Sequence, residues 1–188
     1  MNSTEKIKYH CENKKYCSVY RKVGNNTNEK TDVFIVDYSN EFLILQNVGD
    51  FFIHGYIIIP IKTIQKIRFN DCDRYFDKMY RSEGITDKIR NKNKVDLGSW
   101  KSIFETIKNL GFNVIIENEN PDDESFDIGP IIEIDENSVT IRHFNAKGYL
   151  DEEPTKIIWS LITIVKFDDN YINTFSKYLR KRKPKKLI

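Results

Sequence analysis

Ile64-Gln-Lys-Ile-Arg-Phe-Asn-Asp71 aligns without a gap with Ile162-Thr-Ile-Val-Lys-Phe-Asp-Asp169. Each segment is an apolar run, typical of a strand, that ends in polar residues able to begin a helix. Aromatic residues at helical spacing follow both segments, at 75–80 and at 171–179. Similarity at a fixed spacing indicates an internal repeat, so we expect a duplicated unit that ends in a strand and a helix. Two unrelated β-meanders that came to look alike are the alternative.

Short apolar runs separated by polar turn residues fill the rest of the first half, which is the pattern of β-strands. Gly49-Asp50 suits a tight hairpin turn, because glycine tolerates positive φ. Many of the runs are apolar at consecutive positions, so their strands need cover on both faces. We therefore expect a curled barrel with helices or a second unit packed outside it. The expected strands are Cys17–Val23, Val33–Val36, Phe42–Leu45, Phe51–Ile53 with Tyr56–Ile59, and Ile64–Phe69.

The second half repeats this order of strands and turns. A turn at 146–148 answers the one at Gly49-Asp50, and an acidic loop around Pro121 has no counterpart in the first half. The expected strands are Val114–Ile116, Ile131–Ile134, Val139–Ile141, Ile157–Trp159 and the run that begins at Ile162.

Besides the closing helix at 171–179, two helices are expected between and after these strands. Residues 72–83 follow a run of N-cap candidates and stop at Gly84, and residues 99–110 begin at Ser99 and end at Gly111. The fold class is therefore mainly β with short helices (α+β).

Two units divide the chain in this reading. Residues 1–94 form the first β-barrel-like unit with its closing helix and linker. Residues 95–188 form the second, with a leading helix, the acidic loop, a closing helix and a basic tail.

Composition indicates the cellular location and the classes of partner to expect. The formal net charge of +2 is too small to indicate nucleic acid binding by itself. Cys11, Cys17 and Cys72 form no CxxC pair and fit reduced thiols in a cytosol. The first residues lack the apolar core of a signal peptide, and no apolar run approaches the roughly 18 residues of a membrane span. We therefore expect a cytoplasmic protein with no membrane contact, and the wealth of Lys, Asn and Ile is typical of an AT-rich bacterial genome.

Three segments resemble the strongly bent five-stranded barrel of Sm-like (LSm) proteins. They are Val36-Asp-Tyr-Ser-Asn-Glu-Phe-Leu-Ile-Leu45, Phe52-Ile-His-Gly-Tyr-Ile-Ile-Ile-Pro60 and Ile64-Gln-Lys-Ile67. The likeness is closest to uncharacterised bacterial proteins with a Gly-Tyr-Ile/Val-Ile strand and a following helix, and it covers residues 17–84 and, more loosely, 112–180. The resemblance implies two tandem small barrels, a kind of fold that often oligomerises and often binds RNA.

The positions with which Sm-like proteins read bases are altered here. Asn40 or Glu41 stands just after the Asp turn, and His54-Gly55 stands where Arg-Gly is typical. In the second half that place holds Glu152-Glu153, which would repel phosphate. The resemblance therefore implies the fold without the nucleotide site.

The sequence offers no catalytic or cofactor signature. His10-Cys11 and Cys17 lack the two tight pairs of a structural zinc site. His54 and His143 titrate in the range of general bases, yet no Ser or Cys stands in a nucleophile setting, so structural histidines are expected. The acidic loop lacks the pattern of an EF-hand. We expect no enzyme, no metal and no cofactor.

Charge is concentrated at two places. Residues 117–136 hold nine acids and no Lys or Arg, and residues 180–186 are the reverse. A patch of one sign steers association with the opposite sign, so we predict a non-catalytic protein-interaction module, one version of which is an immunity-type inhibitor of a basic partner. A solvated, self-repelling loop is the alternative. The predicted contact residues are Glu119, Asp122, Asp123, Glu124, Asp127, Asp151, Glu152 and Glu153.

The rival hypothesis is an Sm-like RNA-binding protein whose cations grip phosphate. Cations also suit the C-terminus of a helix, so a solvated tail stays open as an explanation. The residues of this hypothesis are Arg180, Lys181, Arg182, Lys183, Lys185 and Lys186, together with Lys14, Lys15, Arg21 and Lys22.

Overall fold

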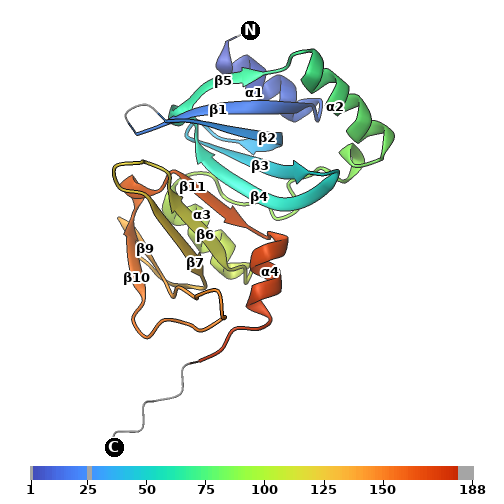
Figure 1. Cartoon of the computed structure of the whole chain (residues 1–188). Helices are drawn as coiled ribbons and strands as arrows, with labels where there is room; N and C mark the ends of the chain where they lie inside the picture. Colours follow the sequence, from blue (N-terminus) through green and yellow to red (C-terminus); the bar gives the residue numbers. More distant parts are fainter. Residues whose placement is uncertain (1, 25–26, 182–188) are drawn as a thin grey trace, which may run out of the picture.

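The computed structural model of the chain describes residues 2–24 and 27–181 (Figure 1). Its described part is a mixed α+β fold of four α-helices and eleven mostly antiparallel strands, which confirms the predicted class. None of its described helices has the length and apolar character needed to cross a membrane.

The first half begins with a helix and continues through five strands. These elements are α1 (Ser3–Glu12), β1 (Tyr16–Val23), β2 (Thr27–Tyr38), β3 (Phe42–Gly49), β4 (Phe52–Pro60), the 3-10 turn η1 (Ile61–Thr63), β5 (Ile64–Arg68), α2 (Asp71–Ser82) and η2 (Thr86–Lys88). All of the strands predicted here are confirmed. Helix α1 was not predicted, although Asn2 and Glu5 form the capping box that starts it.

The second half has a similar sequence of elements. They are α3 (Trp100–Asn109), β6 (Val114–Asn118), β7 (Ser125–Gly129), β8 (Ile131–Ile134), β9 (Ser138–Ile141), β10 (Thr155–Ile158), η3 (Trp159–Leu161), β11 (Ile164–Phe167) and α4 (Asn170–Ser176). Ser99 caps α3 as predicted, and Asn70 caps α2. Strand β7 was not predicted, because its residues were assigned to the acidic loop.

One large sheet runs through both halves. Its eight strands follow the order β5-β1-β2-β3-β4-β11-β6-β7, and a second sheet has the order β10-β9-β8. The halves meet where β11 pairs antiparallel with β4, with Val165 opposite Ile58. On its other side Val165 lies opposite Ile116 of β6.

The expected closed barrels are not formed by the described strands. The outer edge of β4 is occupied by β11, so β5 and β7 remain at the two ends of one open, curled sheet (Figure 1).

The main core also crosses the boundary between the halves. Phe42 meets Trp100 with ring centroids 4.7 Å apart, and Tyr56 stacks on Phe167 at 5.2 Å. Both pairs belong to one cluster of buried side chains that includes Ile103, on the apolar face of α3. The division into units at residues 94 and 95 stays a prediction, but each half lends apolar surface to the other.

One turn and one strand position show where backbone conformation matters. In the β3–β4 hairpin, Asp50 (φ 47°) and Phe51 (φ 62°) adopt the positive φ values that we expected glycine to supply. Gly55 (φ 122°) is a stricter requirement, because a Cβ there would lie 2.6 Å from the carbonyl oxygen of Asp168. That close approach lies where β4 meets the end of β11.

Candidate interaction surface

The acidic loop of the second half is an ordered turn between β6 and β7. The Asn118 side-chain amide donates to the Asp123 carbonyl oxygen (2.6 Å), and the Asp123 backbone N–H donates to the Asn120 carbonyl oxygen (2.9 Å). The Asn120 backbone N–H donates in turn to the Asn118 side-chain oxygen (3.2 Å). We name residues 118–124 the acidic turn. Its backbone is fixed by its own asparagines, a feature that the count of acids did not reveal.

Gly24, which follows β1, braces the acidic turn from the first half. Gly24 (φ 60°) lies against the side chains of Asn120 and Pro121, in a space that a Cβ would fill. Because this contact joins residues about 100 positions apart, it orients the acidic turn relative to the large sheet.

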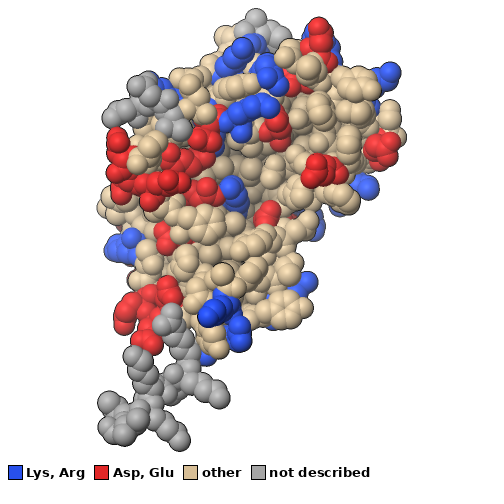
Figure 2. Space-filling model, viewed as in Figure 1, with Lys and Arg blue, Asp and Glu red and all other residues tan. Residues whose placement is uncertain are grey.

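Exposed carboxylates project from this rigid turn. Asp122, Asp123 and Glu124 are exposed, and so is Phe126, whose ring is 52% accessible just beyond them. Figure 2 shows acidic side chains gathered on the side of the molecule where the β6–β7 turn lies. The arrangement presents negative charge next to an apolar ring.

Glu119 belongs to the interior of the molecule rather than to this surface. Its carboxylate accepts two hydrogen bonds from the Arg21 guanidinium, at 2.7 and 2.8 Å, and one from the Thr163 hydroxyl at 2.8 Å. Burial alone would raise the pKa of Glu119, but the bonds and charge of Arg21 outweigh it and lower that pKa overall. The Arg21 side chain is only 1% exposed, which also removes it from the basic residues available to RNA.

Asp127 is likewise turned to a neighbour within the fold. One of its carboxylate oxygens lies 3.5 Å from Nδ1 of His143, and burial raises the pKa of this carboxyl against the lowering effect of that histidine. His143, in the loop after β9, therefore lies against β7.

A second acidic group lies on the loop between β9 and β10. Glu152 and Glu153 are exposed, whereas Asp151 is half-buried and its backbone N–H donates to the His143 carbonyl oxygen (2.8 Å). In Figure 2, acidic side chains near the lower end of the molecule lie apart from those gathered on the side of the β6–β7 turn. The predicted acidic surface is thus divided into two groups.

The basic tail lies mostly outside the described residues, which end at Lys181, so Arg182, Lys183, Lys185 and Lys186 are not placed. Helix α4 ends at Ser176, four residues before Arg180. The Arg180 guanidinium lies over the Tyr149 ring at 4.5 Å, and its Nε donates to the Lys147 carbonyl oxygen. Arg180 therefore ties the tail to the loop after β9 instead of acting on the helix dipole.

A pocket of about 650 Å³ lies between the halves. Trp100 and Trp159 supply aromatic surface to it, and Lys22 and Lys62 supply positive charge. Thr163, whose hydroxyl donates to Glu119, also lines this pocket. The buried Arg21–Glu119 pair therefore holds one of the pocket's lining residues in place.

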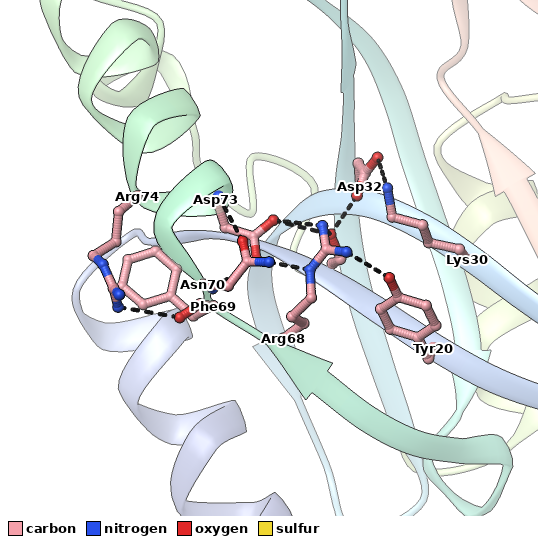
Figure 3. A network of polar contacts seen from close by, with 9 residues as sticks. Tyr20, Lys30, Asp32, Arg68, Phe69, Asn70, Asp73 and Arg74 are labelled. Atoms are coloured by element: carbon pink, nitrogen blue, oxygen red, sulfur yellow. Dashed lines mark hydrogen bonds and ion pairs between the residues drawn. The ribbon is translucent and has the colours of Figure 1, made fainter.

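A polar network fills the space between the first sheet and α2 (Figure 3). Arg68 donates to both carboxylate oxygens of Asp73 (2.8 and 2.9 Å) and to the Tyr20 hydroxyl (2.7 Å). Burial would raise the pKa of Asp73, but Arg68 and the capping bond from the Asn70 backbone lower it overall. The network anchors α2 to the sheet, and its link between Arg68 and the helix cap was not predicted.

The other candidate side chains are scattered. Among residues 2–24 and 27–181, no three His, Cys, Asp or Glu side chains gather in a way that could hold a metal ion. His10 is buried, with Nδ1 3.2 Å from the Lys15 carbonyl oxygen, and His54 Nε2 lies 3.1 Å from the Gly49 carbonyl oxygen. Burial raises the pKa of the Cys17 thiol far above its usual range.

Comparison of the chain with protein-family models, with curated proteins and with solved structures finds no match.

Proposed function

We propose that this chain is a non-catalytic protein-interaction module that docks a basic protein through its acidic turn. The observation that carries the proposal is the order of that turn. Asn118, Asn120 and Gly24 fix its backbone, and its three consecutive carboxylate residues remain exposed. A merely solvated loop has no need of this support.

Pre-organisation favours binding for a physical reason. A loop that is already ordered loses less conformational entropy when a partner orders it. Exposed carboxylates of one sign accelerate the encounter with a basic surface, and an adjacent exposed aromatic ring is the kind of side chain that anchors an interface. Asp122–Glu124 and Phe126 supply these two elements side by side in the sequence.

The experiment neutralises the turn while it leaves its backbone bonds in place. Asp122→Asn, Asp123→Asn and Glu124→Gln are combined, because the hydrogen bonds described above for the turn use the Asn118 and Asn120 side chains and backbone groups. The partner is captured from lysate of the source organism with the unmodified chain and is then titrated against each variant. The turn variant is expected to bind at least about tenfold more weakly, a change of about 1.4 kcal/mol.

A matched variant controls for net charge. Glu12→Gln, Glu83→Gln and Asp87→Asn remove the same three charges from exposed sites in the first half. This control should bind within about twofold of the unmodified chain, because distant surface charges are screened beyond about 8–10 Å. Equal weakening in both variants would reduce the effect to net charge and contradict a specific site.

For the fold, we propose a tandem of two Sm-like units left open at their junction. Each half contains a leading helix, a 3-10 turn of three residues (η1 or η3) before its last strand, and pairing of that last strand with its first. Strands β7 and β8 would together replace the long β2. These parallels support a duplication, and the ungapped match of residues 64–71 with 162–169 agrees with them.

A second candidate function is RNA binding in the pocket between the halves. Lys22 and Lys62 offer phosphate contacts there, and Trp100 and Trp159 offer surfaces for bases, although Trp100 is largely buried. Binding of an unstructured oligoribonucleotide should then weaken steeply with salt and fall further in Lys22→Gln/Lys62→Gln. Lack of binding at low salt would remove this candidate, and loss of binding only after removal of residues 180–188 would place it on the tail.

A further inference from the structure

A pocket of about 340 Å³ opens in the first half between β1, β2, the β3–β4 turn and α2. It adjoins the polar network of Figure 3, and none of its lining residues belongs to the acidic turn. Its lining combines the aromatic residues Tyr16, Phe76 and Tyr80 with the charged residues Lys30, Asp32, Asp50, Arg68 and Asp73.

The aromatic side of this pocket is built from neighbouring rings. The Tyr16 ring centroid lies 5.8 Å from that of Phe76 and 5.2 Å from that of Tyr80. Tyr16 and Tyr80 are 5% and 3% exposed, and Phe76 closes the outer side at 41%. The faces of Tyr16 and Tyr80 are covered by neighbouring rings, so Phe76 supplies the accessible aromatic face of the pocket.

Both tyrosines bring an unused hydroxyl to the pocket. Within residues 2–24 and 27–181, neither the Tyr16 nor the Tyr80 hydroxyl has a hydrogen-bond partner. Both oxygens are unpaired without being fully buried. Burial raises the pKa of Tyr80, and the nearby carboxylates of Asp32 and Asp50 raise it further. Two neutral phenols and two carboxylates therefore meet in one small space.

The charges of the pocket leave one carboxylate in excess. Lys30 is paired with Asp32 at 2.7 Å, and Arg68 is fully used by Asp73, Ser18 and Tyr20. Asp50 has no ion-pair partner in the described part of the chain. Two cations against three carboxylates give the lining a formal charge of −1.

From these contacts we infer that this pocket binds an alkylated ammonium group, either of a free small molecule or of a modified side chain on a protein. The accessible face of Phe76 attracts such soft cations through the ring quadrupole. The Asp50 carboxylate balances the charge, and the tyrosine hydroxyls accept from the polarised C–H or N–H groups around the nitrogen. This site is independent of the docking proposed for the acidic turn.

In the experiment, choline is titrated into the full chain, and binding is measured from the shifts of the Tyr16 and Tyr80 ring resonances in NMR spectra. The neutral isostere 3,3-dimethylbutan-1-ol has the same shape without the charge. Choline should bind saturably and at least about tenfold more tightly than the isostere, since the cation–π and carboxylate attractions act on charge alone. Absence of saturable shifts, or equal binding of both probes, would overturn the proposal.

Variants place the binding in this pocket. Phe76→Leu removes an aromatic face at a tolerant, partly exposed position, and Asp50→Asn removes the unpaired charge; each should weaken choline binding about threefold or more. Phe52→Leu is the matched control, because that ring is 68% exposed and does not line the pocket. Unchanged affinity in both pocket variants, with an unchanged fold by circular dichroism, would overturn the assignment.

The source of the cation is resolved by a third probe. Acetyl-trimethyllysine-amide that binds more tightly than choline would indicate the side chain of a protein. Equal binding of the two would indicate a free small cation.

Discussion

The guanidinium of Arg21 on β1 forms two hydrogen bonds, 2.7 and 2.8 Å long, with the carboxylate of Glu119, which follows β6 in the other half of the chain. This pair spans 98 positions of sequence; Glu119 is part of the acidic turn, and Thr163, which donates to it, lines the pocket between the halves. The pair joins the two halves by charge, in addition to the backbone pairing of β4 with β11.

Glu119→Gln is expected to destabilise the whole fold. The substitution leaves the Arg21 guanidinium buried without a compensating charge, and such changes cost about 3 kcal/mol or more. Urea denaturation measures the loss as a lower midpoint with an unchanged slope. Glu117→Gln is the control: it removes a carboxylate from a more exposed pair with Lys166 and should cost under about 1 kcal/mol. Equal costs would mean that the buried pair has no special role.

Gly55→Ala tests the junction of β4 and β11. A Cβ at this position meets the backbone of Asp168 and Asp169, and φ of 122° is strained for alanine. We expect a loss of at least about 2 kcal/mol in the free energy of unfolding. Gly84→Ala is the matched comparison, because Gly84 also has positive φ but no atom within 4 Å of an added Cβ. If both variants lose the same amount, the strain is local and the junction is not specifically packed.

Stability should fall as pH drops below about 6.5 because of His10. Burial lowers the pKa of this imidazole, although the bond with the Lys15 carbonyl and the charge of Asp77 act in the opposite direction. The unfolded chain therefore binds the proton at a higher pH than the native state does. The free energy of unfolding then decreases from pH 6.5 downward until the native pKa is reached, and the contribution is constant above pH 6.5. Denaturation at pH 7.5 and pH 5 in the native chain and in His10→Phe measures the difference, and an identical pH dependence would refute this assignment.

The open sheet edges favour self-association in one register. If the halves are repeats, β10 corresponds to β4 and β5 corresponds to β11. The β4–β11 pairing can then recur between β10 of one copy and β5 of another, with Ile158 opposite Ile67. Ile158 is exposed, so Ile158→Asp should weaken self-association in sedimentation velocity without unfolding the chain. Ile132→Asp, an exposed position on the opposite edge strand, should leave it unchanged. A native chain that stays monomeric over the whole concentration range would contradict this register.

Local pattern predicted the elements well. Apolar runs indicated the strands, and Asn70 and Ser99 with their following turns indicated where α2 and α3 begin. The helix at Ser3–Glu12 was missed because its apolar face is narrow, with only Ile7 and His10 buried. Strand β7 was missed because acids at 122–124 hid the alternation that begins at Ser125.

Long-range partners were beyond the reach of such patterns. Nothing near Val165 indicates that it lies between Ile58 and Ile116, and this pairing opens the expected barrels. The run of acids predicted that Glu119 belongs to the acidic contact surface with its neighbours. In the structure it pairs instead with Arg21, which is distant in sequence and buried. Asp122, Asp123 and Glu124 are exposed, as a contact role requires, but the asparagines that order their turn were not predicted.

The most direct test of the central claim is the affinity of the captured basic partner for the chain, measured by isothermal titration with the turn variant and the charge-matched control. Docking through the acidic turn predicts a dissociation constant at least about tenfold higher for Asp122→Asn/Asp123→Asn/Glu124→Gln and nearly unchanged for Glu12→Gln/Glu83→Gln/Asp87→Asn. A turn variant that binds as tightly as the native chain, or the absence of any partner that the native chain retains, would contradict it.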